Sequence, residues 1–185
     1  MILTKTPYRI SLFGGGSDYP KWYRENGGEV ISFAIDKLCY VTARILPPFF
    51  KHRYHVSYSK IEKTKTISEI RHPAVRAALQ KYCAEDSVEI NHVGDLPARS
   101  GIGSSSAFAV GLIHSLFLLK GLKFSKESLA KAAIELEQHD LGENVGSQDQ
   151  ISAAFGGFNK ISFNKDNSFD VKSIIFPGNR RDDLH

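Results

Sequence analysis

Residues 96–107 have the sequence Leu96-Pro97-Ala98-Arg99-Ser100-Gly101-Ile102-Gly103-Ser104-Ser105-Ser106-Ala107 and lead directly into an apolar run that ends at Leu119. Glycines let a ligand approach the main chain closely, and the start of a helix presents amide groups and the positive end of its dipole. Serine hydroxyls add groups that bond phosphate or a hard cation. The stretch therefore predicts a phosphate-binding loop at the N-terminus of a helix.

Two common phosphate-binding motifs do not describe this loop. A Walker A loop needs a lysine after its last glycine, and the chain has none there. The spacing Gly101-x-Gly103-x-x-Ser106 only approaches the dinucleotide fingerprint, which has glycine at its third place. From these residues alone, a capped helix with a flexible entry and no ligand remains an alternative.

A second glycine-rich turn lies near the N-terminus. Residues 8–13 alternate as a strand, with Arg9 on its polar face. The strand ends at Gly14-Gly15-Gly16, and residues 17–20 (Ser-Asp-Tyr-Pro) then open a short helical turn. Taken by itself, Asp18 in this turn is equally well a helix cap.

The helix predicted from residue 126 to about residue 141 carries a carboxylate on its apolar side. Ala130, Ile134 and Glu137 share one face, whereas Glu135 lies on the polar face. A carboxylate among apolar side chains is costly unless a cation or a metal pairs with it. Glu137 is therefore either paired in this way or a glutamate at the flank of the helix whose head reaches water.

A third glycine-rich segment follows that helix. Residues 142–150 have the sequence Gly-Glu-Asn-Val-Gly-Ser-Gln-Asp-Gln, and an apolar run leads from them to Gly156-Gly157. Without further context, Asp149 in this loop is most simply a turn residue that bonds its own backbone.

Together the three segments resemble the GHMP kinases, the family of galactokinase and of the homoserine, mevalonate and phosphomevalonate kinases. The run Pro-x-x-x-Gly-Ile-Gly-Ser-Ser-Ser-Ala at 97–107 resembles the ATP-binding loop of that family, and the Gly-x-x-Asp that ends at Asp149 resembles its third segment. The strand and turn at 7–19 resemble the N-terminal motif of the family, and the matching residues are Pro7, Arg9, Gly14, Asp18 and Tyr19. The resemblance, which extends from residue 7 to residue 158, implies an α+β fold of the ribosomal protein S5 domain 2-like type, a mixed sheet covered by helices. It also implies ATP-dependent phosphoryl transfer to a small molecule.

The resemblance implies a division of roles among the residues. Asp149 would accept or orient the substrate hydroxyl, helped by Arg9, which lowers the pKa of that carboxylate and stabilises transferred charge. Mg²⁺ would lie between Ser105 and Glu137. The residues implied for nucleotide binding are Pro97, Gly101, Ile102, Gly103, Ser104, Ser105 and Ser106. Those implied for binding the sugar are Gly15, Gly16, Ser17 and Asp18.

The first motif narrows the expected substrate. Galactokinases have Gly-Glu-His where this chain has Gly14-Gly15-Gly16, which argues against galactose. The triple-glycine form followed by Ser-Asp is similar to the branch that holds heptose-phosphate kinases and fucokinases. The implied substrate is a heptose 7-phosphate, phosphorylated at its anomeric hydroxyl, with fucose and galactose as alternatives.

Composition and charge are those of a soluble globular protein. The chain has 185 residues, of which 42% are hydrophobic and 24% charged, and a net charge of +4 that suits an anionic ligand. The lysines and arginines are scattered, so neither a nucleic acid nor a membrane is predicted as a partner, while a homo-oligomer stays open. Cys39 and Cys83 are expected to be buried, reduced thiols. The N-terminus lacks a signal peptide and no segment is long enough to span a bilayer, which favours the cytoplasm.

The remaining patterns predict the rest of the fold. The helix after the phosphate-binding loop is predicted at 108–119. The other predicted elements are a pair of strands at 30–35 and 38–46, strands at 54–58 and 87–93, a helix at 73–83, and a hairpin at 159–163 and 169–176. We expect residues 1–176 to form the GHMP kinase N-terminal ATP-binding domain and residues 177–185 to form a polar C-terminal tail.

Members of the family continue into a second, ferredoxin-like subdomain with a further glycine-rich motif, which nothing after Phe176 supplies. We therefore expect the 185 residues alone to bind Mg-ATP weakly, to self-associate and to turn over slowly. Two other classes stay open. One is a catalytically incomplete nucleotide-binding remnant of the same fold, and the other is an RNA-binding module, against which the acidic residues at the site positions argue.

Overall fold

A single long strand, β2 (Gly28–Ile45), runs through the middle of the computed structural model, which describes residues 1–97 and 100–175. β1 (Ile2–Phe13) pairs with β2 in antiparallel fashion along nearly its whole length. β6 (Phe158–Phe163) pairs with the first third of β2 and β5 (Val88–Gly94) with its last third. Because β2 contacts all three strands, it joins the two halves of the sheet.

The sheet continues outward from β5 and β6. β3 (Tyr54–Ser57) pairs in parallel with β5, and β4 (Ile61–Thr64) pairs in antiparallel fashion with β3. At the other edge, β7 (Phe169–Ser173) forms an antiparallel hairpin with β6. The order β4-β3-β5-β2-β6-β7, with β1 alongside β2, makes a mixed sheet of seven strands. The α+β fold with a mixed sheet is therefore confirmed.

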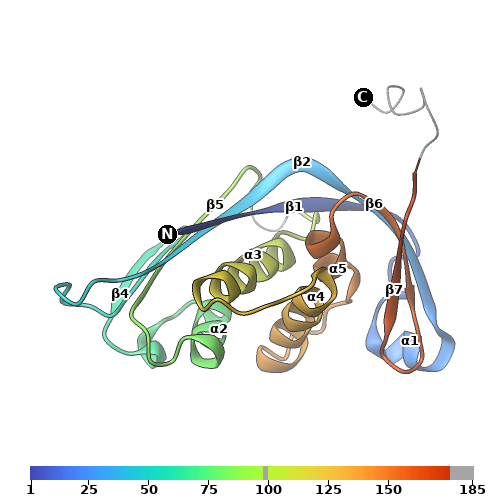
Figure 1. The fold of residues 1–185 in the computed structure, drawn as a ribbon. Helices are drawn as coiled ribbons and strands as arrows, with labels where there is room; N and C mark the ends of the chain where they lie inside the picture. The colour runs from blue at the N-terminus through green and yellow to red at the C-terminus, as the bar shows by residue number, and fades with distance from the viewer. Residues whose placement is uncertain (98–99, 176–185) are drawn as a thin grey trace.

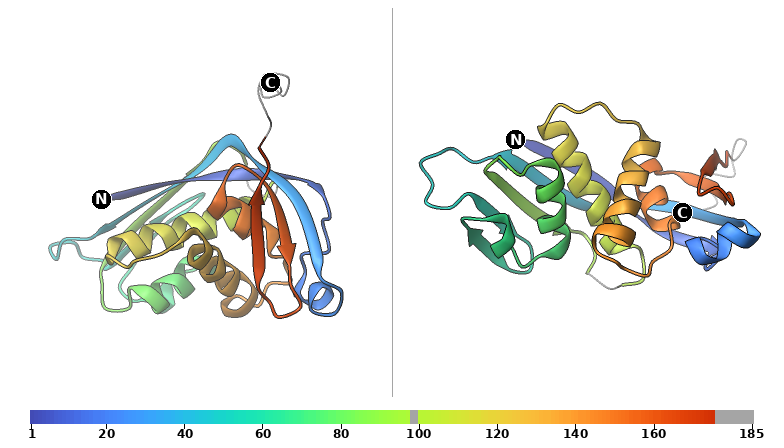
Figure 2. Two further views of the ribbon diagram at one scale, coloured as in Figure 1. Left: turned by 45° about the vertical axis from the view of Figure 1, so that its right-hand side comes forward. Right: turned by 90° about the horizontal axis from the view of Figure 1, so that it is seen from below.

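The larger helices lie together on one side of the sheet (Figures 1 and 2). They are α2 (Pro73–Tyr82), α3 (Ser104–Leu119), α4 (Lys126–Glu135) and α5 (Gln148–Phe155). A short π-helical turn, η2 (Leu136–Asp140), continues α4; a 3₁₀ turn, η1 (Ile67–Glu69), precedes α2; and α1 (Pro20–Asn26) lies near the β6–β7 hairpin.

Helix α3 is the centre of the helical layer. Ten of its residues are buried, from Ser106 to Leu116, and it packs against β1 and β2 on one side and against α4 and α5 on the other. A helix with apolar side chains all round is stable only when neighbours cover it on several sides. Within residues 1–97 and 100–175, no helix has both the length and the apolar character needed to cross a membrane.

Several predicted element boundaries are wrong. The strand pair predicted at 30–35 and 38–46 is one continuous strand, because Asp36 and Lys37 are extended and β1 pairs across both halves. Helix α3 begins at Ser104, earlier than predicted. The loop predicted at 142–150 gives way to α5 at Gln148, so that Asp149 lies in the first turn of a helix. β7 ends at Ser173; position 176 and the predicted tail at 177–185 lie outside the described residues.

The two cysteines agree with the prediction. Cys39 and Cys83 are both buried and free, and burial raises the pKa of the Cys39 thiol to about 12 and that of Cys83 to about 11. A thiol with so high a pKa carries almost no thiolate at neutral pH, so both side chains act as small apolar groups.

A buried hydroxyl pair connects β2 to α5 and yields a test of this packing. The Oγ atoms of Ser32 and Ser152 lie 2.7 Å apart, and both residues are buried. Ser32→Ala or Ser152→Ala should each lower the free energy of unfolding by about 1–2 kcal/mol, because each leaves the other hydroxyl without its partner. The double variant should lose less than the sum of the two single losses, by about 1 kcal/mol. Urea unfolding measures the cycle.

Ser162→Ala is the matched control for that cycle, because the Ser162 hydroxyl bonds the exposed Glu29 carboxylate at 3.4 Å. It should change stability by less than about 0.5 kcal/mol. Strictly additive losses for Ser32 and Ser152 would show that the two hydroxyls are not coupled.

Candidate active site

Arg9 faces the interior at a point where the pairing of β1 with β2 is irregular. Successive side chains of a regular strand point to opposite faces. The pairing of β1 with β2 shifts register between Pro7 and Arg9, and both Tyr8 and Arg9 are largely covered, at 2% and 12% exposure, the latter for the side chain. A bulge of this kind re-aims a side chain. Here it turns the guanidinium of Arg9 toward the start of α3 and α5.

Arg9 joins three segments of the chain. Its Nη2 lies 2.6 Å and its Nε 2.8 Å from Oδ1 of Asp149, on α5. Its Nη1 donates to the carbonyl of Gly101 at 3.2 Å, and its backbone N–H donates to the carbonyl of Ile102 at 3.3 Å. One side chain thus connects β1, the phosphate-binding loop and α5.

The carboxylate of Asp149 lies against the phosphate-binding loop. Gly103 precedes α3 with a φ of 73°, and a Cβ built at this residue would lie 3.0 Å from Oδ2 of Asp149. Burial raises the pKa of Asp149; the Arg9 guanidinium opposes this effect, and the negative charge of Asp18 adds to it. Arg9 does lower the pKa of Asp149, as expected, but burial has the larger effect, so the net shift is upward. A carboxylate with a raised pKa is suited to accept a proton.

The serines that follow differ in exposure and contacts. Ser105 is exposed, whereas Ser106 is buried in the first turn of α3. The hydroxyl of Ser100 donates to the carbonyl of Pro97 at 2.8 Å, which closes the loop on itself. Positions 98 and 99 of the loop lie outside the described residues.

Glu137 is the buried carboxylate that the helical periodicity indicates. It lies on η2, is 2% exposed and accepts hydrogen bonds from Ser106 Oγ at 2.7 Å and from Gln150 Nε2. Burial raises the pKa of Glu137, and bonds from Ser106, Gln150 and Ser105 oppose that rise. By contrast, the Glu135 side chain is 54% exposed and pairs with Lys81 at 2.9 Å.

The sequence prediction missed two partners of Glu137. The sequence predicted Ser105 and Glu137 as joint ligands of Mg²⁺ and gave Ser106 no contact with Glu137. In the structure the buried hydroxyl of Ser106 donates to Glu137. Gln150 is fully buried and bonds Glu137 from α5. Recognising residues 148–155 as a helix would have indicated that Asp149 and Gln150, adjacent in the chain, point to different sides.

Asp18 and its neighbours close the turn after β1. Asp18 is 1% exposed, and its Oδ1 and Oδ2 accept the backbone N–H groups of Gly16 at 3.0 Å and Gln148 at 3.2 Å. The Ser17 hydroxyl bonds the backbone of Gly14 and Glu29. Gly15 lies beside the side chain of Gln148. The predicted contacts of Gly15, Gly16, Ser17 and Asp18 with a substrate stay predictions.

A cavity of about 280 Å³ opens beside the phosphate-binding loop. Its lining includes Ser104, Ser105 and Glu137 together with the aromatic residues Tyr8 and Phe108. Two histidines complete the wall, and burial lowers the pKa of both His72 and His92, which keeps them neutral at pH 7. Within the described residues, Nδ1 of His72 and Nε2 of His92 are buried without a hydrogen-bond partner.

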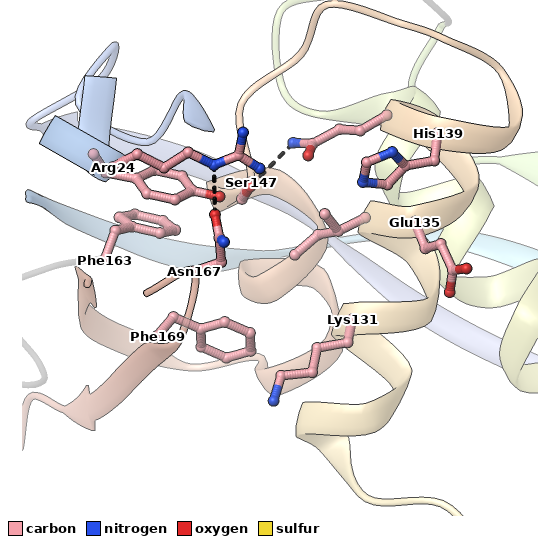
Figure 3. A pocket seen from close by; sticks show the side chains of 11 residues that line it. Arg24, Lys131, Glu135, His139, Ser147, Phe163, Asn167 and Phe169 are labelled. Atoms are coloured by element: carbon pink, nitrogen blue, oxygen red, sulfur yellow. Dashed lines mark hydrogen bonds between the residues drawn. The ribbon is translucent and has the colours of Figure 1, made fainter. Parts of the chain in front are cut away.

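A second hollow, of about 340 Å³, lies between α1, the α4–η2 helix and the β6–β7 hairpin (Figure 3). Its charged groups already have partners: Arg24 Nε donates to Asn167 within the hollow at 2.7 Å, whereas Lys131 pairs with Glu127 and Glu135 with Lys81 outside the lining. None of the residues predicted for the site lines it. The candidate site is therefore the smaller cavity together with the adjoining Arg9–Asp149 pair.

Comparison with known proteins agrees with this geometry. Residues 68–157, which include the phosphate-binding loop, Glu137 and Asp149, match the family model described as GHMP kinases N terminal domain. Residues 68–157 therefore resemble the N-terminal domain of the GHMP kinases.

Relatives of this domain include several sugar kinases. A D-glycero-alpha-D-manno-heptose 7-phosphate kinase from Campylobacter jejuni is 29% identical over 88% of this chain and 50% of its own length. A galactokinase from Thermotoga maritima is 27% identical over 82% of this chain and 43% of its own length. The crystal structure of a D-glycero-D-manno-heptose 1-phosphate kinase from Bacteroides thetaiotaomicron superposes with a TM-score of 0.86 at 26% identity. It matches over 95% of this chain and 60% of its own. The chain thus spans about half the length of the curated relatives it matches.

The donor groups beside the loop suit a magnesium ion that is shared with a ligand. Glu137 and the Ser105 hydroxyl supply oxygen atoms beside the loop, and the described residues contain no cluster of three or more acidic, histidine or cysteine side chains that could hold a metal by themselves. Mg²⁺ in kinases is commonly held by one or two carboxylates together with substrate phosphates. The residues present therefore fit such an ion.

The burial of Glu137 predicts how stability depends on pH. An unfolded glutamate titrates near ~4.3, and the raised folded pKa means that the folded protein holds this proton more tightly. The contribution of Glu137 to the free energy of unfolding is therefore fully present at low pH, and it is lost as the pH rises through the folded pKa. We predict that Glu137→Gln makes the free energy of unfolding fall less between pH 4 and pH 8 than it does in the parent. Urea unfolding at a series of pH values, without nucleotide or Mg²⁺, measures this.

Glu135→Gln is the matched control, since it removes a carboxylate two residues away that is mostly exposed. For this variant, the free energy of unfolding should change with pH as steeply as it does in the parent. A Glu137→Gln curve parallel to that of the parent would contradict a raised pKa at Glu137.

Proposed function

We propose that this site transfers a phosphoryl group from ATP to a hydroxyl of a sugar phosphate. The observation that carries the proposal is the position of the Arg9–Asp149 pair directly against Gly103, where α3 begins. A proton acceptor, a fixed cation and the positive end of a helix meet there, and phosphoryl transfer depends mainly on such positioning and charge neutralisation.

The phosphates of ATP would lie on the loop at the start of α3. The proposed contacts are those of the loop residues Pro97, Gly101, Ile102, Gly103, Ser104, Ser105 and Ser106. The base would occupy the 280 Å³ cavity, where Tyr8 and Phe108 offer rings to stack on. The unpartnered nitrogens of His72 and His92 support this placement, because the edge of a purine carries groups that could bond them.

Ser105 and Glu137 would hold Mg²⁺ at the phosphates. Bound there, the ion would neutralise phosphate charge. It would also favour the ionised form of Glu137, because a nearby cation lowers the pKa of a carboxylate. Ser106 and Gln150 would keep the Glu137 carboxylate oriented, since both donate to it from buried positions.

Asp149 would act as the general base. As the acceptor oxygen bonds the γ-phosphorus and ADP leaves, Asp149 takes the proton of the acceptor hydroxyl. Arg9 orients this carboxylate through two hydrogen-bonding nitrogens and places positive charge next to the transferred group.

The substrate we propose is a heptose 7-phosphate, phosphorylated at its anomeric hydroxyl. Two similar proteins are described as heptose phosphate kinases, and the Gly14-Gly15-Gly16 turn differs from the galactokinase form. The Gln148 side chain is near this turn, since its Nε2 lies 3.8 Å from a Cβ built on Gly15. Its Oε1 is buried without a partner in the described part of the chain and could accept from a sugar hydroxyl. The similarity to galactokinases keeps galactose as the alternative.

An ADP-release assay over a panel of acceptors tests this function. The panel contains heptose 7-phosphate, fucose, galactose, mevalonate and homoserine, each with and without Mg²⁺. We expect the heptose phosphate to give the highest kcat/KM. Asp149→Asn should lower kcat by ~10²-fold or more with little change in ATP affinity, because it removes the base and keeps the shape.

Asp140→Asn is the control, since Asp140 lies at the surface and pairs with Lys81 at 3.4 Å. It should turn over like the parent. A preference for galactose would overturn the substrate, and an unchanged kcat for Asp149→Asn would remove Asp149 from the chemistry. ATP binding by calorimetry without turnover on any acceptor would favour the nucleotide-binding remnant.

A further inference from the structure

The buried Asp18 is bonded to the start of α5 by both its side chain and its backbone. Its Oδ2 accepts the N–H of Gln148 at 3.2 Å, and its carbonyl accepts the N–H of Ser147 at 3.0 Å. Its Oδ1 accepts the N–H of Gly16 at 3.0 Å, which holds the carboxylate in its own turn. One residue thereby fixes the distance between the turn after β1 and the first turn of α5.

Gly146 shows how close this contact is. A Cβ built on Gly146 would lie only 1.9 Å from Oδ2 of Asp18, so any larger side chain would have to displace the carboxylate or the loop. The glycine lets the backbone before α5 pass directly over Asp18. The glycine-rich segment at 142–150 and the glycine-rich turn after β1 therefore meet at one carboxylate.

Asp149 follows Gln148 directly in the chain, so the position of the helix start is also the position of the proposed base. Arg9 holds the Asp149 side chain from β1, whereas Asp18 holds the backbone just before it. Two anchors on different elements restrain both the carboxylate and the helix that carries it.

We propose that Asp18 is a positioning residue, which holds the start of α5 so that Asp149 lies against the phosphate-binding loop. This inference rests on the proposed function and refines it, because it gives Asp18 a role through Asp149 instead of a direct bond to the sugar. The exposure of 1% supports it, as do the backbone N–H groups that both carboxylate oxygens already accept. Burying a carboxylate is costly unless such bonds are made.

The test compares Asp18→Asn and Gly146→Ala in steady-state kinetics with the best acceptor, at a temperature where both variants are folded. Both should lower kcat by ~10- to 100-fold, because a small misplacement of a catalytic group has effects of this size. KM for ATP and for the acceptor should change by less than about threefold. Asn144→Ala, an exposed position in the same loop, is the control and should match the parent.

A double variant examines the contact itself. Asp18→Ala removes the group that a methyl at position 146 would meet, so Asp18→Ala/Gly146→Ala should be no slower than Asp18→Ala alone. If kcat of the double variant fell by the product of the losses in Asp18→Ala and Gly146→Ala, the two sites would act independently and the proposal would be overturned. A rise in the acceptor KM with an unchanged kcat in Asp18→Asn would also overturn it and indicate a direct bond to substrate.

Amide hydrogen exchange separates this inference from the proposed function. The Gln148 amide should exchange ~10-fold or more faster in Asp18→Asn, because an amide that loses its acceptor loses protection. The Asn144→Ala variant should leave that amide protected. Unchanged protection in Asp18→Asn would overturn the positioning role whether or not the protein phosphorylates any acceptor. Lost protection in a protein that releases no ADP would instead count against the proposed function alone.

Discussion

The ion pair between Arg9 and Asp149 is the interaction on which the site depends. The two residues are 140 positions apart in the chain, and the pair also reaches the carbonyl of Gly101. Removing one partner of a largely buried pair leaves the other charge without compensation, which is strongly unfavourable. The pair therefore restrains the relative positions of β1, the phosphate-binding loop and α5, and the catalytic geometry we propose follows from that restraint.

Two carboxylates flank the loop, Glu137 fully buried and Asp149 partly buried, and their surroundings suit them to different tasks. Asp149 has a guanidinium beside it, so it is oriented and charge-compensated within the protein. Glu137 has only neutral donors as hydrogen-bond partners among the described residues, two hydroxyls and an amide, and burial raises its pKa. A carboxylate in that situation gains most from a cation brought by a ligand. The difference supports a base at Asp149 and a metal ligand at Glu137.

The sequence predicted much of this site because local spacing carries its main features. The order of glycines indicated the loop, and helical periodicity placed Glu137, as opposed to Glu135, on the apolar face, while its burial became clear only from the structure. The bulge before Arg9, the unbroken β2 and the bond from Gln150 to Glu137 were not predicted. Each depends on pairing or packing between segments far apart in the chain, which periodicity within one segment does not record.

The most direct test of this account is a crystal structure of the protein with Mg²⁺ and a non-hydrolysable ATP analogue. We predict that the β- and γ-phosphates lie at the start of α3, with the metal bonded to Glu137 and the carboxylate of Asp149 facing the γ-phosphate. An analogue bound in the hollow between α1 and the β6–β7 hairpin, or phosphates on the loop with the metal away from Glu137, would contradict it.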